Sequence, residues 1–332
     1  MPNVVKLIFA VVTFVGALAA HAAVPDWPQG PIRYIVPFAP GGATDMLGRM
    51  VASGLTIRLG QVVLVENKAG QGGSVGTAEL AKAKSDGYTL GGGTISSHGF
   101  NAALYPNLSY DPIKDFTPIT LLATSPNVLV VHPSLNVKTV AEFVVLLKDN
   151  PDRFSFGSSG NGTSQHIAGE MFKVMTGTKF QHVPFNGSSP MLIDLLAGTT
   201  QFSFENINAV LPQIAAGNLV ALAVTTAQRA QVAHDIPTMQ EAGLAGYDIS
   251  SWQALFAPAG TPPLIVKQLQ VEVAAILRQP ENVKKLTELG LQPKSSSSEE
   301  LVAFVATEIP RLAEIVRRSG AKARDPALQK AK

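Results

Sequence analysis

Two stretches rich in glycine and hydroxyl residues have the composition of ligand-binding loops. The first is VPFAPGGATD at residues 36–45, and the second is GSSGNGTSQH at residues 157–166. Each follows a predicted strand and opens a predicted helix, where free backbone N–H groups and the helix dipole attract anions. Neither stretch contains lysine or arginine. We therefore expect them to hold a small carboxylate through backbone N–H and hydroxyl groups, rather than a polyphosphate.

Nucleotide binding is not supported by either of the best candidate motifs. A phosphate-binding Walker loop requires G-x-x-x-x-G-K-[ST], and no lysine follows Gly41 and Gly42. Residues 70–76, GQGGSVG, have the spacing G-x-G-x-x-x-G rather than the dinucleotide spacing G-x-G-x-x-G. They also follow the second predicted strand, and no acidic residue ends a later strand to bind a ribose. We expect a structural turn at residues 70–76 and no cofactor.

Catalytic and metal-binding patterns are incomplete. His166 and Glu170 stand four residues apart, but no third ligand lies nearby, so we expect no metal site. No segment fits the G-x-S-x-G nucleophile motif. A secreted hydrolase that uses Ser158, Ser159 or Ser164 remains an open alternative, because a scattered catalytic set leaves no local motif.

Two further loops end predicted strands, at residues 93–99 and 183–189. They carry hydroxyls, an amide and aromatic side chains, and Asp45 is the charged residue among all four loops. We expect the two glycine-rich loops to hold the carboxylate, and Ser97, Phe185, Asn206 and Trp252 to set ligand specificity. The expected ligand-binding residues are Phe38, Ala39, Pro40, Gly41, Gly42, Thr44, Asp45, Ser96, Ser97, Ser158, Ser159, Thr163, Ser164, His166, Phe185, Asn186, Asn206 and Trp252.

Alternating strand and helix patterns must position these loops. Such an order predicts an α/β fold with mostly parallel sheets flanked by helices. Two extended apolar runs, 116–132 and 250–258, are expected to cross between two lobes. The lobes would then comprise residues 23–123 with 252–332, and residues 124–251, with the ligand cleft between them. Near the C-terminus, a helix at 299–318 begins with a capping box and is expected to kink or split at Pro310.

The N-terminus reads as a signal peptide. Lys6 precedes an apolar run at residues 7–20, and Ala20-His21-Ala22 has the small-x-small pattern of a cleavage site. We expect residues 1–22 to be removed and the mature chain to be periplasmic without membrane insertion. The chain has no cysteine. The formal net charge of the chain is +2, and it is +1 without Lys6. This charge is too small to attract nucleic acid.

Seven runs resemble the tripartite tricarboxylate transporter receptor family, the Bug-type periplasmic solute-binding proteins. They are IVPFAPGGATD, NKAGQGGSVG, SDGYTL, SYDPIKDFTPITLLA, HVPFNGSSPMLIDLLAG, DIPTMQEAGLAGY and ALFAPAGTP, in order along nearly the whole mature chain. The resemblance implies a two-lobed periplasmic binding protein fold of the second class. It also implies capture of a small organic acid by the loops at 37–45 and 158–166, and delivery to a two-subunit inner-membrane permease.

Some positions depart from the family pattern. Phe185-Asn186 stands where Tyr-Lys is common, and His234-Asp235 where Pro-Asp is common. The departure at Phe185-Asn186 falls at the expected pocket, so the family's usual ligands cannot be assumed. The ligand could be a mono-, di- or tricarboxylate. An aromatic acid also remains open, since Phe38, Phe185 and Trp252 could adjoin it. A receptor that serves a signalling sensor instead of a permease is a further alternative.

Overall fold

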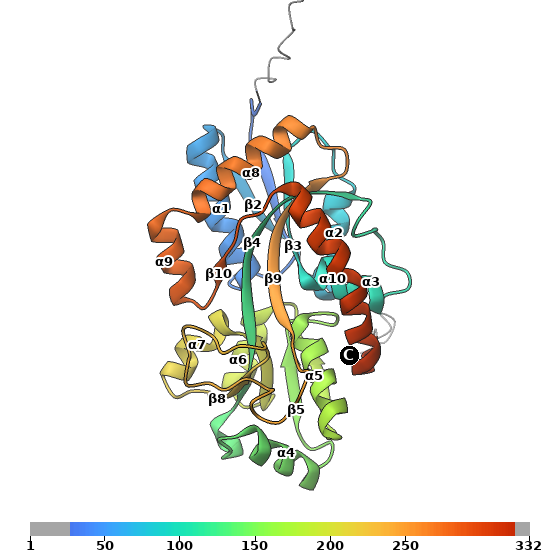
Figure 1. Ribbon diagram of the computed structural model, residues 1–332, viewed down its shortest axis with the longest axis vertical. Helices are drawn as coiled ribbons and strands as arrows, with labels where there is room; N and C mark the ends of the chain where they lie inside the picture. Colours follow the sequence, from blue (N-terminus) through green and yellow to red (C-terminus); the bar gives the residue numbers. More distant parts are fainter. Residues whose placement is uncertain (1–26, 323–332) are drawn as a thin grey trace, which may run out of the picture.

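Two groups of strands, each covered by helices, lie end to end in the computed structural model, which describes residues 27–322 (Figure 1). The predicted signal peptide lies outside the described residues. The strands form one continuous path in the order β2-β1-β3-β9-β4-β7-β5-β6, and β10 and β8 both pair with β4. The predicted α/β class with helix-flanked sheets is confirmed.

The first strand group is built from β-α-β units. Its strand β1 lies parallel to both β2 and β3. Helix α1 buries Leu47, Val51 and Leu55, which recur every four residues, and packs against α8. The elements are β1 (Ile32–Val36), α1 (Ala43–Leu59), β2 (Val63–Asn67), α2 (Ser74–Ala81), β3 (Thr89–Thr94) and α8 (Pro263–Leu277).

The second group repeats this construction. Its strand β5 lies parallel to β6 and β7, and phenylalanines from β5 and β7 form an aromatic core with α4 and α5. The elements are α4 (Val140–Asp149), β5 (Ser155–Ser158), α5 (Ser164–Thr176), β6 (Gln181–Pro184), α6 (Ser188–Leu196), β7 (Phe202–Asn206), α7 (Ile207–Ala215) and β8 (Val220–Val224).

Two long strands join the groups. They are β4 (Phe116–Val131) and β9 (Ser250–Pro258), which pair antiparallel from Phe116 to Pro126 of β4. From Asn127 onward, β4 pairs instead with β7 and β8. The two runs that were expected to cross between lobes, 116–132 and 250–258, correspond to these strands. Strand β4 pairs with strands of both groups. The lobe boundaries at 123/124 and 251/252 stay a prediction. They fall where Thr124 pairs with Trp252.

The C-terminal helix α10 (Ser298–Ser319) begins at the predicted capping box, formed by Ser297 and Glu300. It continues through Pro310, so the helix is not split there, and the alternative expectation of a kink stays a prediction. A proline inside a helix costs about 3 kcal/mol. Buried apolar side chains on both sides of it, including Val305 and Leu312, each contribute about 1.5–3 kcal/mol and hold the helix together.

Several short elements had no clear signal in the sequence. They are the π-helical turn η2 (Ser96–Phe100), α3 (Asn101–Leu104), α9 (Pro280–Glu288) and β10 (Gln292–Pro293). Helix α10 packs along η2, α3 and α5, so it touches elements of both strand groups. Within residues 27–322, no helix has both the length and the apolar character that a membrane crossing requires.

Candidate functional site

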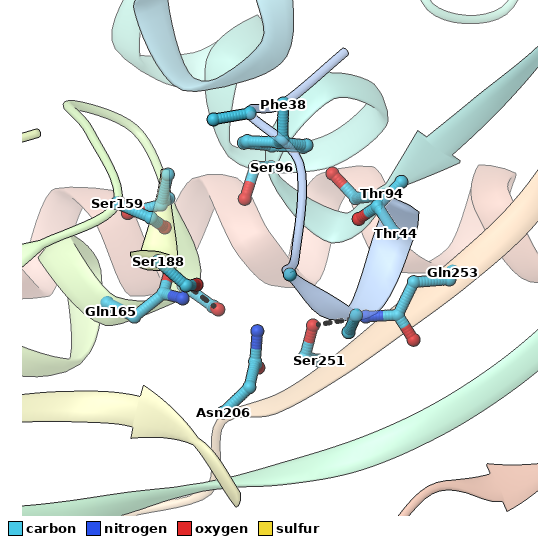
Figure 2. A pocket seen from close by; sticks show the side chains of 15 residues that line it. Phe38, Thr44, Thr94, Ser96, Ser159, Gln165, Ser188, Asn206, Ser251 and Gln253 are labelled. Atoms are coloured by element: carbon cyan, nitrogen blue, oxygen red, sulfur yellow. Dashed lines mark hydrogen bonds between the residues drawn. The ribbon is translucent and has the colours of Figure 1, made fainter. Parts of the chain in front are cut away.

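A small polar cavity lies between the loop after β1 and the starts of α5, α6 and α7 (Figure 2). Its volume is about 30 Å³, which is room for one or two water molecules. None of the described residues that line it carries a charge at neutral pH. They are Phe38, Ala39, Gly42, Ala43, Thr44, Thr94, Ser96, Ser159, Thr163, Ser164, Gln165, Ser188, Asn206, Ser251 and Gln253.

Four helix N-termini converge on this cavity. Residues of the first turn or the N-cap of α1, α5, α6 and α7 line it. The N-caps of α1 and α6 are Gly42 and Gly187, which have no side chain to cap the helix. The side chain of Asn206 makes no capping hydrogen bond at α7, whereas that of Thr163 accepts one from the N–H of His166 at α5. First-turn N–H groups have no partner within their own helix. The cavity is therefore surrounded by backbone donors and positive dipole ends.

Asp45 stabilises the loop before α1 through hydrogen bonds to its carboxylate. Its carboxylate accepts hydrogen bonds from the N–H of Gly41 at 3.0 Å, from Asn67 at 2.9 Å and from Arg49 at 3.0 Å. Asn67 also donates to the carbonyl of Phe38. Burial raises the pKa of Asp45, but these hydrogen bonds outweigh it and hold the pKa below its ordinary value. Asp45 thus shapes the loop without lining the cavity.

The second glycine-rich loop follows β5 and turns back on itself. The hydroxyl of Thr163 donates to the carbonyl of Gly160 at 2.7 Å, and Gly162 donates through its N–H to Nδ1 of His166. Gly162 has φ of +80°, a conformation that favours glycine. This geometry places Ser159 and Thr163 at the cavity wall.

Ser158 has a partner that could serve as a catalytic base. Its Oγ lies 2.6 Å from Nε2 of His182, and both residues are buried. However, Ser158 has no exposed surface and does not line the cavity. A serine nucleophile must reach its substrate. The serine–histidine pair is therefore separated from the cavity, and it braces β5 against β6.

Of the eighteen residues expected from sequence, nine line the cavity. They are Phe38, Ala39, Gly42, Thr44, Ser96, Ser159, Thr163, Ser164 and Asn206. Six further lining residues were missed, namely Ala43, Thr94, Gln165, Ser188, Ser251 and Gln253. The expected helix starts contained a signal for Ala43, Gln165 and Ser188. No local pattern marks Ser251 and Gln253, which reach the cavity because β9 pairs with β4.

The other nine expected residues lie around the cavity without lining it. Ser97 is buried and bonds to Thr94 and His98. Trp252 is in the core, where its Nε1 donates to Glu308. Phe185 packs on a core cluster beside the exposed Asn186. The remaining five are Pro40, Gly41, Asp45, Ser158 and His166, which belong to the two glycine-rich loops or the helices that they open. A ligand role stays a prediction for all eighteen expected residues, including the nine that line the cavity.

The loops on the two sides of the cavity touch each other. Tyr105 donates its hydroxyl hydrogen to the carbonyl of Asn161 at 3.3 Å, and Ser189 donates to the carbonyl of Pro40 at 2.8 Å. A Cβ placed on Gly72 would lie 2.2 Å from the carbonyl oxygen of Asn161. The structure therefore shows a closed arrangement around the cavity.

A family model described as "Tripartite tricarboxylate transporter family receptor" matches residues 47–321 of the chain. The chain belongs to this family. Members are periplasmic solute receptors, so the resemblance seen in the sequence is confirmed. The sequence is 35% identical to protein BugT of Bordetella pertussis, over 96% of this chain and 99% of BugT.

Solved structures of the family share the fold. Rpa4515 of R. palustris, solved with adipate, is 38% identical with a TM-score of 0.86, over 90% of this chain and 99% of that one. MatC of Rhodopseudomonas palustris, solved with bound malate, is 32% identical with a TM-score of 0.84, over 87% of this chain and 100% of that one. The predicted two-lobed periplasmic binding protein fold is confirmed.

Proposed function

We propose that this receptor captures a small organic acid in the cavity by closing its two lobes, and delivers it to a two-subunit membrane permease. The observation that carries the proposal is the convergence of four helix N-termini on a cavity whose described lining holds no charged side chain. Helix N-termini favour anions through their dipoles and free N–H groups. A small carboxylate satisfies these donors and requires no cationic partner.

The similar structures of Rpa4515 and MatC support a carboxylate, because their ligands, adipate and malate, are both dicarboxylates. Hydroxyls of Thr44 and Ser159 line the cavity here and can bond a carboxylate directly or through ordered water. Ser251 and Gln253 lie on the β9 side of the cavity (Figure 2). We assign specificity to these two residues and to Asn206.

The cavity volume supports capture by closure. Pockets for small ligands measure about 300–1,000 Å³, which is far above the volume found here. An acid must therefore enter a more open form. We propose that residues 23–123 with 252–332, and residues 124–251, move as the two lobes about β4 and β9. A ligand that bridges both glycine-rich loops would stabilise the closed form.

Calorimetry and thermal unfolding of the mature protein test this proposal. The panel comprises adipate, malate, citrate and an aromatic acid, with a neutral sugar and a divalent cation as controls. We expect binding heat and a raised unfolding temperature with at least one acid, since a ligand that binds the folded form stabilises it. A response to the sugar or cation without any response to the acids would contradict the proposal.

Delivery and export are tested separately. Deletion of the gene should abolish uptake of the labelled acid by cells, whereas a signalling receptor would leave uptake intact and change gene expression. N-terminal sequencing of the exported protein should show cleavage after Ala22, as predicted from the small-x-small pattern.

A further inference from the structure

One carboxyl oxygen organises three residues of the cavity. Oε1 of Glu205 accepts hydrogen bonds from Nε2 of Gln165 at 2.9 Å, from Oγ of Ser188 at 3.0 Å and from the N–H of Asn206 at 2.7 Å. These donors belong to the starts of α5 and α6 and to the N-cap of α7. All three line the cavity, whereas Glu205 lies behind them with no exposed surface.

The second carboxyl oxygen of Glu205, Oε2, is buried without a hydrogen-bond partner among the described residues. No lysine or arginine within those residues pairs with Glu205. An ionised carboxylate that is buried without a cation is costly, and an unsatisfied charged oxygen adds to that cost. Burial raises the pKa of Glu205, and the three hydrogen bonds lower it by less. A proton on Oε2 removes the buried charge.

The elements packed around Glu205 carry few titratable groups. Strands β4 and β5 and helix α7 carry none. On α5, Nδ1 of His166 accepts from the N–H of Gly162, and Glu170 pairs with Lys173. Asp194 on α6 accepts from the N–H of Thr200. On β6, the ring of His182 stacks on that of His166, with centroids 4.2 Å apart.

We propose that Glu205 is a positioning residue of the ligand site and holds Gln165, Ser188 and Asn206 as a neutral carboxylic acid when an organic anion is bound. The inference rests on the proposed carboxylate-binding function. A charged Glu205 would place a second anion directly behind the ligand, in a region where water screens little. Ligand binding therefore favours the protonated form, and affinity falls as the pH rises and ionises Glu205.

Three variants of the full mature chain test the positioning role. Glu205→Gln keeps the acceptor oxygen and is permanently neutral, whereas Glu205→Ala removes the acceptor. Glu170→Gln on the same α5 helix is the matched control, because Glu170 bonds to Lys173 and does not line the cavity. The probe is whichever of adipate and malate binds the wild type more tightly in calorimetry.

At mildly acidic pH, we expect the wild type, Glu205→Gln and Glu170→Gln to bind with similar affinity. We expect Glu205→Ala to bind about tenfold more weakly or worse, because three donors lose their partner. As the pH rises, affinity should fall for the wild type and Glu170→Gln but stay level for Glu205→Gln. Wild-type affinity in Glu205→Ala, or an equal loss in Glu205→Gln at acidic pH, would overturn the positioning role.

Proton uptake supplies a readout that a purely structural role would not move. Calorimetry in buffers of different ionisation enthalpy should show that the wild type takes up a proton with the ligand at alkaline pH, while Glu205→Gln does not. Equal uptake in both proteins would show that another group titrates, and would overturn the neutral-acid assignment.

Unfolding without ligand separates this inference from the proposed function. An acid whose pKa is raised by folding stabilises the protein below its unfolded pKa, and the stabilisation is lost as the pH rises through the folded pKa. Wild-type stability should therefore fall relative to Glu205→Gln with rising pH. A difference in stability between the two proteins that does not change with pH would overturn the neutral-acid assignment. If the wild type loses stability relative to Glu205→Gln with rising pH while neither the wild type nor any variant binds a carboxylate, the proposed function fails and the protonation assignment stands.

Discussion

The hydroxyl of Ser189 donates a hydrogen bond to the carbonyl of Pro40 across 2.8 Å, although the two residues are 149 positions apart. Pro40 belongs to the glycine-rich loop before α1, and Ser189 to the first turn of α6. Neither side chain lines the cavity. The bond therefore ties together the two sides of the site without depending on direct contact with the ligand.

Substitution Ser189→Ala should weaken ligand binding by about twofold to tenfold. A hydrogen bond of this kind contributes about 0.5–1.5 kcal/mol, and here that energy belongs to the closed arrangement. Ser298→Ala is a matched control, because Ser298 donates to the carbonyl of Pro118 away from the cavity. Calorimetry should show weaker binding for the first variant and unchanged binding for the second. Equal affinities for both variants would count against a closing role for the Ser189 bond.

Gly162→Ala should impair binding more than its backbone strain alone predicts. A Cβ at this position would lie 2.1 Å from Oδ1 of Asn101, a residue held in place by its bonds to Gly72 and Ser74. Gly177 has a similar positive φ, but a Cβ there meets no atom within 4 Å. Both alanine variants should lose about 1–2 kcal/mol of unfolding free energy through strain.

The two glycine variants should differ in calorimetry. We expect affinity to fall about tenfold in Gly162→Ala, because the loop that carries Ser159 and Thr163 is displaced from Asn101. Gly177→Ala should bind as the wild type does. Similar affinities in the two variants would show that the contact between Gly162 and Asn101 does not matter for binding.

Asp45→Asn should reduce stability at neutral pH and leave it unchanged in acid. The pKa of Asp45 is lowered in the folded protein, so its contribution is present above the unfolded pKa of about 4 and is lost as the pH falls through the folded pKa. We expect a loss of about 1–2 kcal/mol at pH 7, since Arg49 is half exposed and screened. Urea unfolding of the wild type and Asp45→Asn at several pH values measures this loss of unfolding free energy. A loss that persists at strongly acid pH would contradict this origin.

Ligand affinity should change less than about twofold between low and physiological ionic strength. Salt weakens attraction between exposed charges, over a screening length of about 8–10 Å. The described lining of the cavity carries no cationic side chain, and the helix N-termini that face it are shielded from solvent. Calorimetry in increasing potassium chloride tests this expectation. A steep fall in affinity would indicate a basic contact to the ligand.

The sequence predicted the glycine-rich loops well, because their signal is local. A strand, a run of glycines and hydroxyls, and a helix start are contiguous in the chain. Gly42, Thr44, Ser159 and Thr163 line the cavity, and their contact with a ligand stays a prediction. Side chains farther along were harder to place. Trp252 and Ser251 are neighbours in sequence, yet only Ser251 reaches the cavity, because successive residues of a strand point to opposite faces.

By itself, the sequence determined the alternation of strands and helices, the absence of lysine and arginine from the two glycine-rich loops, and the family. These properties depend on residue type and local spacing, which the chain displays directly. Tertiary structure alone decided that Ser251 and Gln253 of β9 join the helix starts at the cavity. It also decided that Glu205 stands behind three cavity residues, Gln165, Ser188 and Asn206. Such contacts depend on strand pairing between distant segments, and the cost of a buried, partnerless carboxyl oxygen exists only once the chain has folded around it.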